Sequence, residues 1–279
     1  MKWPKCELPM FEPGWVWLVG TGPGDPGLLT VHAVNAINQA DVIVFDALVN
    51  PAILELAPAG CVIEYAGKRG GKPSAKQRDI TFRLIELARK KKRVLRLKGG
   101  DPFIFGRGGE EALALVEAGI LFRVVPGISA GVGGLAYAGI PLTHRDTNQT
   151  VTFVTGHDAR GLVPNAVDWS AVAKGSPVIV MYMALKHHEA IVSKLLAAGR
   201  RPDEPAAIIC NATLSDQSVV ETTLASLPLV VAENAIQPPA IIVVGAVVEL
   251  RAALDWIGMM NGRSLTVDAW DMCRQRETG

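Results

Sequence analysis

Short apolar runs rich in β-branched residues alternate, in the first half of the chain, with stretches whose apolar residues recur at helical spacing. The apolar runs predict strands at 16–19, 42–45, 61–65, 94–98 and 122–125. A helix is predicted at 77–91, where one face carries Ile80, Leu84, Leu87 and Ala88. Alternation of this kind is typical of βα units and a mostly parallel sheet.

The pattern resumes in the second half, after a polar stretch at 139–148. Strands are predicted at 151–155, 178–181, 206–210 and 241–244, and helices flanked by Gly or Pro at 186–198 and 247–256. We therefore predict an α/β protein of two domains with mostly parallel sheets, at 15–145 and 146–257. Residues 1–14 are predicted to form an N-terminal arm, and 258–279 a tail without a clear pattern.

The composition is that of a folded protein, with 49% apolar and 20% charged residues. The 28 Lys and Arg residues nearly balance the 27 Asp and Glu residues, so a net charge of +1 provides no overall field to attract nucleic acid or an acidic membrane. The apolar runs, such as 240–248, are shorter than the roughly 18 residues that span a bilayer. We therefore expect neither a nucleic-acid partner nor a membrane partner.

The four cysteines lie far apart and form no CxxC pair. This spacing favours neither a zinc site nor a disulfide framework. The first 13 residues include Glu7, Glu12 and three prolines, where a signal peptide would need an apolar stretch. These features lead us to expect a cytoplasmic location.

The turn after the first strand, at 20–27, reads GTGPGDPG. Its glycines satisfy the GxGxxG spacing of dinucleotide-binding turns, and Asp46 ends the second strand, where such folds have a ribose-binding acid. However, Pro23 and Pro26 lack the N–H groups through which such a turn binds pyrophosphate. A nicotinamide-binding turn and a purely structural turn both stay open at this point.

Two further strands end in small residues. The strand at 94–98 is followed by GGDP at 99–102, and the strand at 122–125 by PGISA at 126–130. Glycines at the carboxyl end of a strand let a ligand approach the backbone, at the edge where open α/β sheets bind their ligands. Glu110 and Glu111 suit the start of a helix, so a tight strand-to-helix turn is the alternative.

Eight segments, in this order, resemble the tetrapyrrole methylase family and, within it, the methyltransferases that act on uroporphyrinogen III. They are VGTGPGDPGLLT from Val19, DALV from Asp46, YAGKRGG from Tyr65, LKGGDPFIFGRGGEE from Leu97, VVPGISA from Val124, GIPLTHR from Gly139, YMAL from Tyr182 and PPAIIVVG from Pro238. The likeness extends over about 15–256. It implies two α/β domains with the active site in the cleft between them.

The resemblance implies S-adenosylmethionine as the methyl donor and S-adenosylhomocysteine as its product. It implies cofactor contacts at Pro23, Gly99, Gly100, Asp101, Ile104, Ser129, Ala130, Met183, Ala212 and Ala240. Such residues suit a ligand that carries a sulfonium, an ammonium and a carboxylate, because backbone groups and the Asp101 acid can face its polar part. Ile104 and Met183 offer apolar walls for adenine. Ser129 stands where Thr is equally expected, and Ala212 stands where relatives often have Gly.

The implied substrate is uroporphyrinogen III, a reduced cyclic tetrapyrrole with eight carboxylates. Methylation at C2 and C7 gives precorrin-2 by way of precorrin-1. The acidic substrate calls for local cations, and the candidates are Lys68, Arg69, Arg107 and Arg145. Taken singly, each of them also suits an ordinary solvated surface position.

Asp46 and Lys68 match positions for which base and acid roles are suggested in the family, and Arg107 with Glu110 matches a substrate-orienting pair. Arg107 is not expected to act as a base, because a guanidinium hardly deprotonates in proteins. No metal is expected, because the adjacent His187 and His188 lack the spacing at which a helix presents two ligands to one ion.

The resemblance also implies a homodimer. The chain lacks the dehydrogenase and ferrochelatase region of bifunctional sirohaem synthases, so methylation alone is expected. A later corrin-ring methylase, a methylase of unrelated acceptors on the same fold, a nicotinamide oxidoreductase and a non-catalytic tetrapyrrole carrier stay open as alternatives. The segments at 65–71 and 139–145 favour uroporphyrinogen III over other methylase substrates. Precorrin-2 precedes cobalamin, sirohaem and haem d1 alike.

Overall fold

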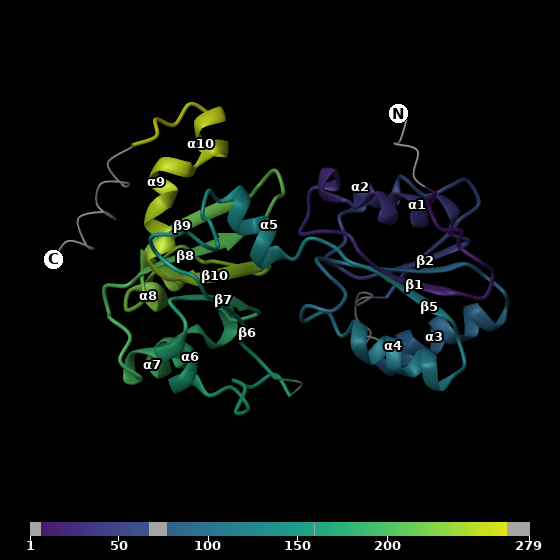
Figure 1. Ribbon diagram of the computed structural model, residues 1–279, viewed down its shortest axis with the longest axis horizontal. Coiled ribbons are helices and arrows are strands. Elements are labelled where there is room, and N and C mark those ends of the chain that lie inside the picture. Colours follow the sequence, from purple (N-terminus) through teal and green to yellow (C-terminus); the bar gives the residue numbers. More distant parts are fainter. Residues whose placement is uncertain (1–6, 67–76, 159, 267–279) are drawn as a thin grey trace. The chain divides into compact units, whose positions relative to one another are not determined.

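The computed structural model describes residues 7–66, 77–158 and 160–266, and all structural statements below concern these residues (Figure 1). The chain divides into two compact units, residues 1–129 and 130–279. Each unit contains one five-stranded sheet.

The first sheet is entirely parallel, with the strand order β3-β2-β4-β1-β5. Its strands are β1 (Val16–Gly20), β2 (Val42–Phe45), β3 (Val62–Tyr65), β4 (Val94–Lys98) and β5 (Phe122–Val125). The five predicted strands are confirmed to within one residue, and so is the predicted parallel sheet.

Helices cover both faces of this sheet (Figure 1). One face packs against α1 (Val31–Gln39) and α2 (Pro51–Leu54), and the other against α3 (Gln77–Arg89) and α4 (Gly108–Glu117). Side chains alternate along each strand, so Leu95 and Leu97 of β4 face α1 and α2 while Val94 faces α3 and α4. A short 3-10 helix, η1 (Pro26–Leu28), precedes α1.

The second sheet is mixed, which corrects the expectation of two mostly parallel sheets. Its order is β6-β7-β10-β8-β9, and only β6 and β7 pair in parallel. Its strands are β6 (Val151–Thr155), β7 (Val178–Tyr182), β8 (Pro205–Cys210), β9 (Ser218–Thr223) and β10 (Ala240–Val244). An apolar run indicates that a strand is buried but not in which direction it runs. The sequence pattern also missed β9, whose residues are mostly polar and only partly buried.

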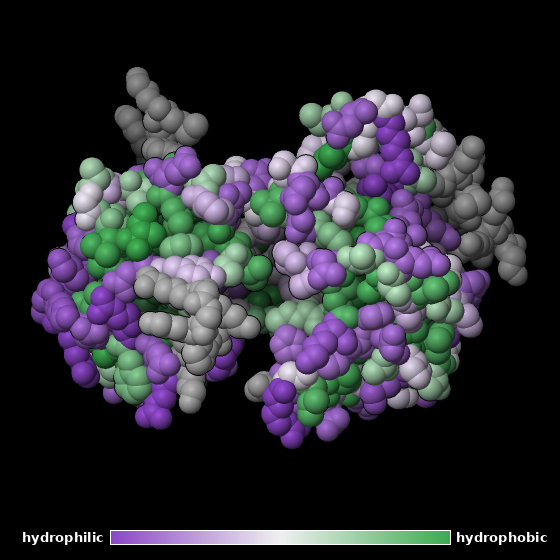
Figure 2. All heavy atoms as spheres, turned by 180° about the vertical axis from the view of Figure 1, so that it is seen from behind, coloured by the Kyte–Doolittle hydropathy of each residue, from purple (hydrophilic) through white to green (hydrophobic). Residues whose placement is uncertain are grey.

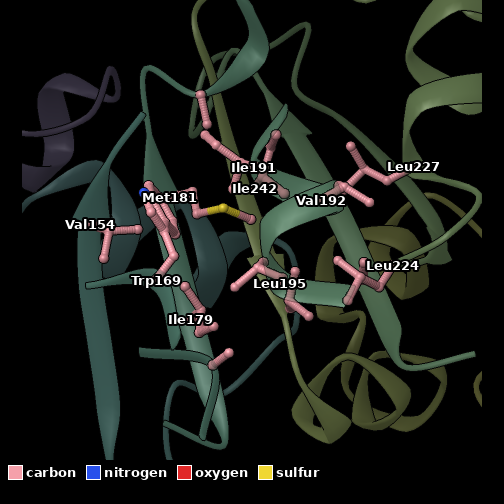
Figure 3. Packing of buried hydrophobic residues seen from close by; sticks show 14 of the residues in the cluster. Val154, Trp169, Ile179, Met181, Ile191, Val192, Leu195, Leu224, Leu227 and Ile242 are labelled. Carbon is pink, nitrogen blue, oxygen red and sulfur yellow. The ribbon is translucent and has the colours of Figure 1, made fainter. Parts of the chain in front are cut away.

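Helices also cover both faces of the second sheet. On one face, α6 (Trp169–Gly175), α7 (His188–Ala197) and α8 (Leu227–Glu233) enclose a core that includes Met181, Leu195 and Ile242 (Figure 3). On the other face lie α5 (Ala130–Tyr137) and η3 (Ala246–Leu250). The remaining helices are η2 (Leu185–His187), α9 (Arg251–Leu254) and α10 (Trp256–Met260).

The units divide after Ser129, earlier than the expected boundary after residue 145. The reason is packing, because Leu135, Ala138 and Ile140 are buried against strands of the second sheet. The single helix expected at 247–256 is instead η3 followed by two short α-helices. Its end is set by Asp255, whose carboxylate accepts a hydrogen bond from the Gly258 N–H at 3.0 Å and so begins α10.

Within the described residues, no helix is long and apolar enough to span a membrane. Polar and apolar side chains are interspersed over the visible face of each unit (Figure 2).

Candidate active site

Three glycine-containing turns meet at the carboxyl edge of the first sheet. They follow β4, β1 and β5, which are adjacent strands. A Cβ atom on Gly20 would lie 2.5 Å from the carbonyl oxygen of Gly100 and 2.6 Å from the nitrogen of Gly127. The backbones therefore touch at a distance that only glycine permits.

Backbone hydrogen bonds join two of these turns directly. The Gly100 N–H donates to the Gly22 carbonyl at 2.7 Å, and the Gly22 N–H donates to the Gly100 carbonyl at 3.2 Å. One residue earlier, Thr21 donates both its N–H and its hydroxyl to the Lys98 carbonyl, at 2.9 and 3.0 Å. Pro23 and Gly99 flank this pairing and are brought together by it.

Asp101 joins the turn after β5 to the turn after β4. Its carboxylate accepts hydrogen bonds from the Phe103 N–H at 2.7 Å and from the Gly127 N–H at 3.0 Å. The side chain is buried, and Ser129, two residues beyond Gly127, is buried as well. Ile104 follows in the same turn and is 38% exposed. The structure therefore brings together Pro23, Gly99, Gly100 and Asp101, with the turns that carry Ile104 and Ser129.

The cofactor candidates of the second unit lie around one edge of its sheet. Met183 directly follows β7, Ala212 follows β8, and Ala240 begins β10 beside the end of β8. Because β10 runs antiparallel to both neighbours, its first residue lies at the edge where β7 and β8 end. Ala130 opens α5, and the next residue, Gly131, donates its N–H to the Tyr182 hydroxyl at 2.8 Å.

Several residues near these turns have backbone torsions that are uncommon for side chains other than glycine. Phe105 and Arg107 have φ values of 52° and 58° in the first unit, and Met183, Asn211 and Thr213 have values of 53°, 48° and 65° in the second. Such conformations concentrate at ligand-binding sites, where the surrounding structure holds them.

Arg107 and Glu110 form an exposed ion pair at the start of α4, 2.6 Å apart. The hydrogen bond from Arg107 holds the pKa of the Glu110 carboxyl below its usual value, and the same bond raises the pKa of Arg107. Arg107 is therefore a permanent cation beside a carboxylate. This arrangement suits the binding of an anion and not the removal of a proton.

Asp46 follows β2 at the same edge of the first sheet. One carboxylate oxygen accepts from the Leu48 N–H at 3.1 Å, and the other accepts from the Arg96 guanidinium at 3.3 Å. The Arg96 side chain is only 3% exposed, whereas that of Asp46 is 29% exposed. Asp46 is thus the solvent-facing end of a buried contact.

The sequence pattern missed the contact between Asp46 and Arg96 and the buried charges beside it. Arg96 and Lys98 both bind Glu111, on α4. Charged residues at alternate positions of an otherwise apolar strand were the signal that could have revealed it, because such residues share one face of the sheet.

Arg145 lies in the second unit, exposed in a turn that Asn148 holds together. Asn148 accepts from the His144 N–H at 3.0 Å and donates to the Leu142 carbonyl at 2.8 Å. Lys68 and Arg69 lie outside the described residues.

Among the residues that the structure describes, no group of three His, Cys, Asp or Glu side chains could hold a metal ion. A ring nitrogen of His187 lies 2.8 Å from the Gly161 carbonyl oxygen, and one of His188 lies 2.6 Å from that of Leu185.

Comparison with known proteins places these features in a family. The profile of the tetrapyrrole (corrin/porphyrin) methylases matches residues 16–228. A uroporphyrinogen-III C-methyltransferase from Sinorhizobium sp is 66% identical over 261 residues, which cover 94% of this chain and 93% of that protein. A uroporphyrin-III C-methyl transferase from Thermus thermophilus, solved in complex with S-adenyl homocysteine, has a TM-score of 0.73 at 37% identity and covers 85% of this chain and 100% of its own.

Siroheme synthases are also similar to the chain. That of Pseudomonas fluorescens (strain SBW25) is 50% identical over 248 residues, which cover 89% of this chain. The chain spans about half the length of this relative, 53%.

The contact between the glycine turns predicts that two Gly→Ala substitutions change the free energy of unfolding by different amounts. Gly127→Ala places a methyl group against the Gly100 carbonyl oxygen and 2.8 Å from the Gly20 carbonyl carbon, so it should lower the free energy of unfolding by about 3 kcal/mol. Gly109→Ala meets no atom within 4 Å and lies in α4, where alanine should be neutral or stabilising by up to about 1 kcal/mol. Denaturant unfolding of both variants measures the difference, and equal stabilities would contradict the contact.

Proposed function

The chain belongs to the tetrapyrrole methylase family, and from this premise we propose that it transfers methyl groups from S-adenosylmethionine to C2 and C7 of uroporphyrinogen III. The product is precorrin-2, formed by way of precorrin-1. The observation that carries the proposal is the 66% identity to the Sinorhizobium uroporphyrinogen-III C-methyltransferase, which extends over nearly the whole of both chains. The siroheme synthases support the same tetrapyrrole chemistry over the part of their length that matches.

The turns of the first unit have glycines and an acidic side chain that suit the methyl donor. S-adenosylmethionine supplies an electrophilic methyl group on a sulfonium, and its amino acid part carries an ammonium and a carboxylate. Gly99 and Gly100 carry no side chain that would keep such a ligand away from the backbone. The Asp101 carboxylate accepts two backbone N–H groups, and a carboxylate has about four acceptor positions, so capacity remains for an ammonium.

Apolar side chains supply the other part of the cofactor site. Ile104 is 38% exposed and Met183 is 42% exposed, so both offer uncovered surface to an adenine ring. The proposal assigns the remaining contacts to Pro23, Ser129, Ala130, Ala212 and Ala240. They are small or rigid residues on the same turns and strand ends, where a ligand can approach the backbone.

The substrate carries eight carboxylates, and Arg107 is the cation best suited to meet one of them. It is exposed, its charge is permanent, and its guanidinium can bind a carboxylate through two parallel hydrogen bonds. Glu110 orients the guanidinium when no substrate carboxylate is bound. Arg145 is assigned a second carboxylate, and Lys68 and Arg69 belong to the same proposal although they lie outside the described residues.

Methyl transfer to a pyrrole carbon must be followed by loss of a proton from the ring system. We assign the acceptor role to Asp46, because its carboxylate is accessible and both of its oxygens are held by hydrogen bonds. Lys68 is assigned the matching acid role from the family resemblance. Most of the rate enhancement is then expected from positioning and from the exclusion of water.

The finer biological assignments follow from the family resemblance. We propose a cytoplasmic homodimer whose product supplies cobalamin, sirohaem or haem d1 synthesis. Neither nucleic acid nor a membrane has a part in the proposed activity.

An anaerobic incubation with uroporphyrinogen III and S-adenosylmethionine tests the proposed reaction. Mass spectrometry of the product should detect two added methyl groups and two equivalents of S-adenosylhomocysteine. A reaction without S-adenosylmethionine is the control. A product without added methyl groups would refute the function.

Two substitutions should separate substrate binding from cofactor binding. Arg107→Ala should lower kcat/KM for uroporphyrinogen III by about tenfold or more, since a charge-assisted contact is lost, and leave the Kd for S-adenosylhomocysteine within about twofold. Gly100→Val should weaken S-adenosylhomocysteine binding by more than about tenfold, because a side chain enters the turn at a φ of 67°. Steady-state kinetics and calorimetry measure the two effects.

Arg201→Ala is the matched control, because Arg201 also forms an exposed ion pair with a nearby acid, Asp203. Arg201→Ala should change neither kcat/KM for uroporphyrinogen III nor the Kd for S-adenosylhomocysteine. Equal loss of cofactor affinity in Arg107→Ala would contradict the division of roles.

A further inference from the structure

Four charged side chains form one cluster between β2, β4 and α4. Arg96 and Lys98 project from β4, Glu111 from the first turn of α4, and Asp46 follows β2. The side chains of Arg96, Lys98 and Glu111 are 3%, 4% and 0% exposed. Asp46 is the only member with substantial access to solvent, at 29%.

Arg96 is the central residue of the cluster, and all three of its nitrogens have partners. Its Nε lies 3.2 Å from Glu111, and its Nη1 donates to the Leu97 carbonyl at 2.7 Å and lies 3.5 Å from the Val44 carbonyl. The remaining nitrogen, Nη2, points to Asp46 at 3.3 Å. The guanidinium is thereby fixed against two strands and one helix, with one nitrogen directed at Asp46.

Glu111 is held from two sides. Lys98 lies 3.3 Å from one oxygen of the Glu111 carboxylate and 3.2 Å from the other, and Arg96 binds the first of them. Burial lowers the pKa of the Lys98 ammonium, and the nearby charge of Arg96 lowers it further, while Glu111 and Asp46 oppose the shift. The cluster therefore pairs two basic side chains with two acidic ones.

Stability alone is a weak reason for such a cluster. Desolvating buried ions is unfavourable, and well-packed apolar residues of similar size are often equally stabilising or more so. A rigid guanidinium directed at one accessible carboxylate is, by contrast, what precise positioning requires.

We propose that Arg96, fixed by Glu111, is a positioning residue that holds the Asp46 carboxylate in place to accept the proton released after methyl transfer. This role rests on the proposed function. Lys98 contributes by holding Glu111. The same contacts join α4, which carries Glu110 and directly follows Arg107, to the strand that leads into the turn at Gly99 and Gly100.

A second arginine–aspartate pair joins the opposite ends of the same two strands. Arg93, just before β4, contacts Asp41, just before β2, at 2.7 and 3.2 Å through its side chain and at 2.8 Å through its N–H. Hydrogen bonding by Arg93 lowers the pKa of the Asp41 carboxyl. This pair lies at the amino edge of the sheet, away from the ligand-binding edge, so it provides a matched structural control.

A double-mutant cycle tests the proposal. The wild type, Arg96→Lys, Asp46→Asn and the double variant are assayed for kcat with uroporphyrinogen III, and each is checked for thermal unfolding and S-adenosylhomocysteine affinity. Arg96→Lys keeps the buried positive charge but loses the planar guanidinium that contacts Glu111 and Asp46 at the same time. It should lower kcat by about 100-fold, because the Asp46 carboxylate is then displaced. In the Asp46→Asn background the same substitution should lower kcat by less than about twofold, since the group that it positions is already lost.

Glu111→Gln provides a second route if Arg96→Lys does not fold, because it keeps the shape of the side chain and removes the negative charge that helps to fix Arg96. It should also lower kcat in the wild type and have little further effect in Asp46→Asn. Arg93→Lys should leave kcat within about twofold, since it disturbs only the structural pair.

Independent, multiplicative losses from Arg96→Lys and Asp46→Asn would overturn the positioning role while leaving the proposed function intact. A wild type that does not methylate uroporphyrinogen III would overturn both. Unchanged kcat in Arg96→Lys would overturn the positioning role alone.

Discussion

The contact among the backbones of Gly20, Gly100 and Gly127 is the constraint on which the proposed ligand-binding edge of the first unit depends. Three adjacent parallel strands end at the same edge, and their turns meet there without side chains between them. Hydrogen bonds between Gly22 and Gly100 then fix the turns in one arrangement. Turns that are ordered in this way before a ligand binds lower the entropy that would be lost on binding.

The Asp101 carboxylate also fixes the turns at this edge. Asp101 was expected to face the cofactor, and the structure adds that its carboxylate already joins two turns through the N–H groups of Phe103 and Gly127. Beneath the edge, Arg96, Lys98 and Glu111 replace apolar core with buried charge. The face of β4 that carries Leu95 and Leu97 packs in the apolar core, whereas the opposite face of the same strand carries the buried charges of Arg96 and Lys98.

Most strands could be predicted because they are short runs of mainly apolar, often β-branched residues. The polar strand β9 could not, and neither could the antiparallel pairs of the second sheet, because strand direction depends on connections that periodicity does not report. The helix expected at 247–256 is a 3-10 helix followed by α9, and it ends at Asp255, where a local hydrogen bond to the Gly258 N–H begins a new helix.

The candidate site was predictable in its residue types but not in its contacts. Glycines after strands indicated a ligand edge, yet their mutual approach depends on which strands are neighbours, and the order β4-β1-β5 is not encoded locally. Asp46 was identified by resemblance, whereas its contact with Arg96 joins residues fifty positions apart in sequence. Hydrophobic periodicity predicts helices, strands and burial, but it does not predict the roles of individual polar residues.

Hydrogen exchange with and without S-adenosylhomocysteine tests the central claim most directly, that the turns after β1, β4 and β5 and the strand ends around Met183 and Ala212 bind the cofactor. Saturating ligand should slow exchange at 20–24, 99–104, 126–131, 182–184 and 210–213, and leave the exposed face of α3 unchanged. Protection confined to other segments, or none at saturation, would contradict the account.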